Sequence, residues 1–163
     1  MKTNKSVKVT AIDGKDFPKW ARPEYMNRAS VMVNKRSFDC TEHVAVCVKR
    51  PTFFVDQAKS KKVKALGWTE KIFPAATVGR AWLHKNANDE RDYKSGFVVC
   101  MVGSVQVNLK YLLMVERLFP GCSWAAPKNA ADGPVQAIIN GAVVAFVAGQ
   151  SEGGGAIGEK VPA

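Results

Sequence analysis

Short runs of apolar residues, separated by polar turns, follow one another along most of this chain. Runs of about four to eight residues that are rich in β-branched side chains are typical of strands. The pattern predicts strands at residues 7–12, Ala29–Val33, Val44–Val48, 96–102, 105–107, 122–125, 133–139 and 142–148, with shorter extended pieces at 71–74 and 81–84. Asn140 and Gly141 join the last two strands, and this dipeptide between apolar runs is a strong hairpin signal.

Residues 109–119 have the spacing of an amphipathic helix, and Asn108 precedes them as an N-cap. Lys110, Glu116 and Arg117 are expected to point away from the core. The core side is assigned to Leu109, Leu112, Phe119 and either Val115 or Leu113. A second helix is predicted before residue 70, so the fold class is α+β, with antiparallel sheets packed against about two helices.

The chain has 163 residues, of which 47% are hydrophobic, enough for one domain with a core of its own. We expect a single domain over residues 1–150, with a basic half (1–95) and a neutral half (96–150), and a flexible Gly-rich tail at 151–163. No apolar run is long enough to span a bilayer, and four cysteines are too few for a disulfide framework. These features predict a cytoplasmic protein with no membrane partner and with reduced, mostly buried thiols.

The net charge is +10, from 24 Lys and Arg against 14 Asp and Glu. Residues 1–95 hold 20 basic and 10 acidic side chains, whereas residues 96–163 hold four of each, so the whole surplus lies in the first part. A surplus of this size indicates a polyanionic partner, most simply a nucleic acid.

The densest basic segment coincides with the second predicted helix, residues 53–66. Its four lysines are Lys59, Lys61, Lys62 and Lys64. Two interpretations stay open: an ordinary solvated helix face, or a row of cations that contacts a phosphate backbone.

The sequence holds no strong signal for a catalytic or metal-binding site. Cys40, His43 and Cys47 have a zinc-like spacing but no fourth ligand, and Cys47 lies in an apolar run where a buried thiol is the natural role. There is no nucleophile elbow and no phosphate-binding loop. We therefore expect neither an enzyme nor a cofactor nor a metal.

Residues 107–119 contain Asn108, Tyr111, Leu112 and Leu113, and this segment resembles the second helix of a domain in the bacterial DNA polymerase III beta sliding clamp. In that family the helix precedes a strand, an alternating apolar segment and a last apolar strand, and the same order is found here over about residues 98–148. Met114 replaces the family's Asp. The resemblance implies a shortened clamp-like protein, of a kind that a phage carries, which holds duplex DNA through phosphate contacts and slides along it.

The resemblance also implies that Lys110 and Arg117 join the lysines of residues 53–66 on a DNA-facing surface, and that several copies close a ring beside a replication protein. Two alternatives remain. One is a basic module that stacks single-stranded bases on aromatic side chains. The other is a phage accessory protein whose charge complements an acidic protein partner.

Overall fold

The computed structural model describes residues 8–16, 29–33, 35–41, 43–50, 71–84, 97–128 and 134–149. The helical elements are the 3₁₀ helix η1 (Gly14–Asp16) and the α-helix α3 (Leu109–Leu118). The strands are β1 (Ala29–Val33), β2 (Arg36–Cys40), β3 (Val44–Val48), β4 (Ala75–Ala76), β5 (Val78–His84), β6 (Phe97–Val102), β7 (Val105–Asn108), β8 (Ser123–Ala125), β9 (Val135–Ile139) and β10 (Ala142–Val147).

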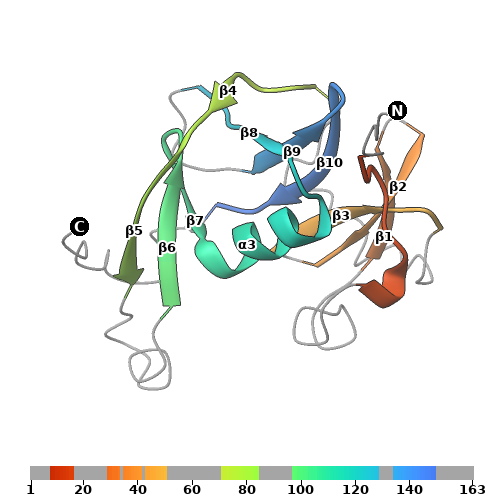
Figure 1. Cartoon of the computed structure of the whole chain (residues 1–163), viewed down its shortest axis with the longest axis horizontal. Coiled ribbons are helices and arrows are strands. Elements are labelled where there is room, and N and C mark those ends of the chain that lie inside the picture. The colour runs from red at the N-terminus through yellow and green to blue at the C-terminus, as the bar shows by residue number, and fades with distance from the viewer. Residues whose placement is uncertain are drawn as a thin grey trace, which may run out of the picture.

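Within the described ranges, seven strands form one antiparallel sheet in the order β1-β2-β3-β10-β9-β8-β4. Two three-stranded meanders, β1-β2-β3 and β8-β9-β10, therefore meet where β3 pairs with β10 (Figure 1). Strands from both sides of residue 95 thus build the same sheet.

A second sheet has the order β5-β6-β7 in the described part of the chain. Thr77 alone separates β4 from β5, so the chain passes directly from the edge of the large sheet into the small one. Helix α3 follows β7 and packs against β6, β7 and β10 (Figure 1). The helix therefore lies where the two sheets come together.

A large apolar core fills the space between the two sheets and α3. It joins Val44, Val46 and Val48 of β3 to apolar side chains of β6, β7, β9, β10 and α3. Ala45 and Cys47 of the same strand belong to a second cluster, on the opposite face. Strand β3 is buried at every position because apolar groups cover both of its faces.

Most of the predicted elements are confirmed. Strands β1, β3, β6, β7, β8, β9 and β10 and helix α3 lie where the pattern places them, within one or two residues. The α+β fold class is confirmed, with antiparallel sheets against a helix. The predicted helix at residues 53–66 and the tail at 151–163 lie outside the described residues. No helix in the described part of the chain is long and apolar enough to cross a membrane.

The strand predicted at residues 7–12 is wrong in its described part. Only Ile12 pairs with a neighbour: its N–H donates to the Cys47 carbonyl and its own carbonyl accepts from the Lys49 N–H, both at 3.0 Å. The chain enters η1 two residues later, so pairing ends after one bridge. The sequence analysis also missed β2, because Arg36 and Asp39 are poor strand formers.

Candidate nucleic-acid interface

Six lysine and arginine side chains are predicted to contact nucleic acid, and the structure describes two of them. Lys110 and Arg117 both lie on α3 and both are exposed. The other four, Lys59, Lys61, Lys62 and Lys64, lie outside the described residues. The geometry of the candidate interface is therefore that of α3.

Helix α3 begins where the sequence predicts, because the Asn108 side chain accepts a hydrogen bond from the Lys110 N–H at 3.0 Å. Tyr111, Leu112, Met114 and Val115 are its buried residues. Val115 is fully buried and Leu113 is 52% exposed, so the core position that was left open belongs to Val115.

The solvent face of α3 carries Lys110, Leu113 and Arg117. Leu113 is three residues after Lys110 and four before Arg117, so the three side chains are neighbours on the helix surface. The two cations are two turns, or about 10 Å of helix length, apart. An exposed leucine with a cation on either side of it along the helix is the most distinctive feature of this face.

Glu116 is the one acidic residue of α3, and its carboxylate turns toward the body of the protein. Its Oε2 accepts a hydrogen bond from the Trp124 indole Nε1–H at 3.0 Å, and Trp124 is buried in β8. Burial, and secondarily the Glu116 charge, raise the pKa of both Cys100 and Cys122 to about 11. Glu116 therefore faces β6 and β8.

Tyr111 is a contact point between α3 and the turn after β2. The His43 ring stacks on Tyr111 with 5.5 Å between ring centroids and 14° between planes. The Lys110 ammonium lies 5.3 Å from the centroid of the same ring. The exposed His43 imidazole thus lies beside Lys110, in the first turn of the helix.

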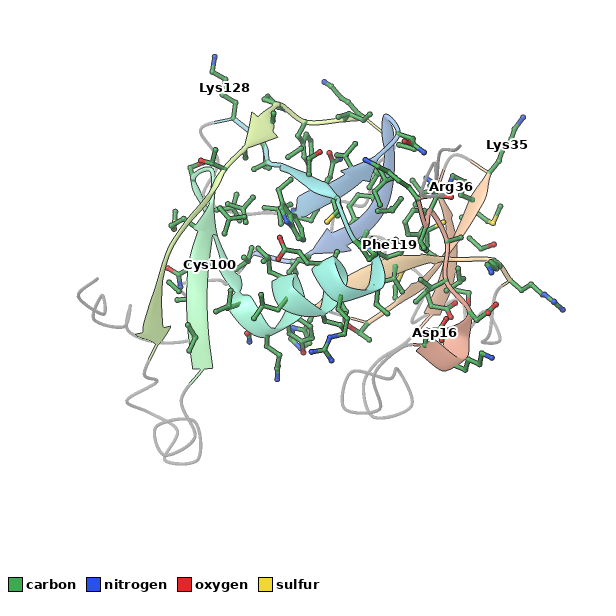
Figure 2. All side chains as sticks on the ribbon, in the orientation of Figure 1. Asp16, Lys35, Arg36, Cys100, Phe119 and Lys128 are labelled. Atoms are coloured by element: carbon green, nitrogen blue, oxygen red, sulfur yellow. The ribbon has the colours of Figure 1, made fainter. Side chains whose placement is uncertain are left out.

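Three other described cations, Lys35, Arg36 and Lys128, belong to other parts of the molecule. Figure 2 shows Lys35 and Lys128 projecting outward from different corners of the molecule. Arg36 has a structural role: its guanidinium donates to the carbonyls of Thr10 and Val143 and lies 5.8 Å from the Phe38 ring centroid. The α3 face thus carries the two predicted nucleic-acid contacts that the structure describes, Lys110 and Arg117.

The zinc-like spacing of Cys40, His43 and Cys47 does not bring the three side chains together. Both thiols lie in the second apolar cluster, as predicted for Cys47, whereas His43 stacks on α3. Burial raises the pKa of both thiols, for Cys47 against an opposing effect of Arg36. No group of three or more metal-ligating side chains occurs among the residues that the structure describes.

The sequence analysis missed the roles of His43, Trp124 and Glu116 at this face. Their partners lie far away in sequence or in another element, and no spacing rule connects them. Glu116 was expected to point away from the core; the residue is exposed, but its carboxylate turns toward Trp124. Comparison of the chain with protein-family models, curated proteins and solved structures finds no match.

Proposed function

We propose that this protein is a non-enzymatic, clamp-like protein that binds duplex DNA without reading its sequence. The observation that carries the proposal is the solvent face of α3, where Lys110 and Arg117 are exposed and the acid of the same helix is turned away. Phosphate contacts from such cations hold a duplex without base recognition.

The spacing of the two cations suits a phosphate backbone. They are about 10 Å apart along the helix, so their long side chains can contact separate phosphates of one strand. The chain's net charge of +10 adds long-range attraction to the same partner.

The order of elements supports the clamp-like part of the proposal. Helix α3 is followed by β8, β9 and β10, the order that the resemblance to the sliding clamp implies. In such a protein the helices face the DNA and the sheets form the frame, so α3 with Lys110 and Arg117 is the expected contact surface. The lysines of residues 53–66 are assigned to the same surface.

A charge-matched pair of double variants tests the proposal. In Lys110→Gln/Arg117→Gln, we expect weaker binding to a labelled duplex of about 30 base pairs and a salt slope that is smaller by about two. The control, Lys35→Gln/Lys128→Gln, removes the same charge far from α3 and should keep the slope. Fluorescence anisotropy over a salt series gives both quantities. Equal losses in the two variants would contradict a defined face.

The lysine segment is tested separately. Replacing Lys59, Lys61, Lys62 and Lys64 by Ala should weaken duplex binding and lower the salt slope further. Unchanged binding in this variant would remove the segment from the interface and leave α3 alone.

A single-stranded nucleic acid is the second candidate, favoured by the exposed His43 ring that stacks on Tyr111 beside Lys110. Histidine is one of the side chains on which unpaired bases stack. Competition between unlabelled single strands and duplexes of equal length separates the two. A His43→Ala variant that loses only single-strand binding would favour this candidate.

A further inference from the structure

The hydrogen bond between Trp124 and Glu116 joins an exposed helix residue to a buried strand residue. Trp124 lies in β8 with 5% of its surface exposed, and its indole Nε1–H is 3.0 Å from the Glu116 carboxylate. Indole nitrogen can only donate, so the bond specifies an acceptor at position 116. The interaction therefore selects one direction for the Glu116 side chain.

That direction matters for the solvent face of α3. Arg117 is the next residue, and Leu113, three residues earlier, lies on the exposed side of the helix with Glu116. A carboxylate that extended outward from position 116 would stand within about one Debye length, ~10 Å, of any phosphate that Arg117 binds. It would repel the phosphate and so weaken the contact with Arg117.

The direction of the carboxylate also brings its charge near two thiols. Cys100 of β6 and Cys122, just before β8, both experience the Glu116 charge. Cys100 and Trp124 belong to the large core and Cys122 packs against it, so all three lie on the strand side of the helix. The negative charge of α3 is thus directed to the core side, and the two cations remain on the solvent side.

We infer that Trp124 is a positioning residue for the duplex-binding face: by holding the Glu116 carboxylate against β8, it keeps the phosphate-facing side of α3 positively charged. This inference rests on the proposed function. Trp124 touches no DNA and acts only through the direction of Glu116.

The first measurement is made on the free protein. In a ¹H–¹⁵N spectrum, the indole resonance that disappears in Trp124→Phe is assigned to Trp124. We expect that resonance to move upfield in Glu116→Gln, because a carboxylate acceptor is replaced by a weaker neutral one. An unmoved resonance would overturn the inference, since the hydrogen bond would then be absent in solution.

The second measurement is a double-mutant cycle of duplex binding. At about 50 mM salt, Trp124→Phe should weaken binding about threefold, the effect of one screened like charge near a phosphate. Glu116→Gln should stay within about twofold of the parent chain, and Trp124→Phe/Glu116→Gln should match Glu116→Gln. The threefold loss should also shrink as salt is raised.

A matched control removes another hydrogen bond to a carboxylate. Ser30 donates to the buried Asp39 at 2.8 Å, between β1 and β2, so Ser30→Ala should leave duplex affinity unchanged. If Trp124→Phe weakened duplex binding by the same factor in the Glu116→Gln variant as in the parent chain, altered packing would be the cause and the inference would fail. If Trp124→Phe kept the duplex affinity of the parent chain while Lys110→Gln/Arg117→Gln lost affinity, the inference about Trp124 would fail and the proposed function would stand. A parent chain that bound no duplex would overturn the proposed function itself.

Discussion

Gly141 shows how one backbone conformation sets the β9–β10 hairpin. Asn140 and Gly141 have φ values of 52° and 73°, the left-handed pair that a two-residue hairpin turn needs. An added Cβ at Gly141 would meet nothing within 4 Å, so only backbone strain opposes a larger residue.

Gly141→Ala is therefore expected to lower the free energy of unfolding by about 1 kcal/mol, because an L residue is strained at this φ. Urea unfolding followed by circular dichroism measures the loss. Gly121→Ala, at φ 82° and with only the end of a lysine near its Cβ, should behave alike. A change below about 0.3 kcal/mol at Gly141 would mean that the hairpin relaxes to another turn.

The thiols of Cys100 and Cys122 link stability to alkaline pH. Burial raises the pKa of both from 9.0 to about 11, so the unfolded chain loses these protons before the folded chain does. The folded state then binds more protons between those values, and stability falls as pH rises from about 9 to 11. Urea midpoints at pH 8, 9 and 10 should show this fall.

The matched comparison is Cys100→Ala/Cys122→Ala, whose midpoint should fall less steeply over the same pH range. Absolute stability can differ between the two proteins because a buried thiol is lost, so the slope is the relevant quantity. Parallel slopes would assign the alkaline loss to other groups.

Helix α3 is the element on which the proposed function depends most. Its amphipathic pattern is local, so its start at Asn108 and the exposure of Lys110 and Arg117 were predictable, whereas its buried side was predicted only in part. Stability does not explain a leucine at position 113, because a side chain that is 52% exposed contributes little hydrophobic free energy to folding.

Leu113→Lys is expected to strengthen duplex binding and raise the salt slope by about one, since it places a third cation between Lys110 and Arg117. Leu113→Glu should have the opposite effect. Both variants should unfold at nearly the same urea concentration as the parent chain, because the position is exposed. A shift of affinity in the same direction for both would show that Leu113 itself makes the contact.

At the scale of the whole molecule, the proposed function requires more than one copy. A chain of 17.7 kDa with one described α3 face covers only part of a duplex, whereas a clamp-like protein encloses it. We expect a closed oligomer whose mass, measured by light scattering with and without duplex DNA, is a multiple of 17.7 kDa. A monomer under both conditions would exclude a ring and leave a simple DNA-binding module.

Some elements of this fold are specified by a few neighbouring residues, whereas others depend on partners in other strands. Strand β3 and the β9–β10 hairpin are specified by an apolar run and by Asn140-Gly141, signals contained within a few residues. Strand β2 was missed because its buried Asp39 has a partner in another strand, Ser30 of β1, which donates to it at 2.8 Å. Sequence propensity does not include such a partner, so the strand reads as polar.

The sequence by itself determined the α+β class, the local elements after residue 96 and the excess of positive charge, because each depends on composition or on neighbours along the chain. Tertiary structure decided the rest. It joined two meanders through β3 and β10, buried Val115 in place of Leu113, and turned Glu116 toward Trp124. These outcomes depend on contacts between segments far apart in sequence, where burial and hydrogen-bond partners outweigh local preference.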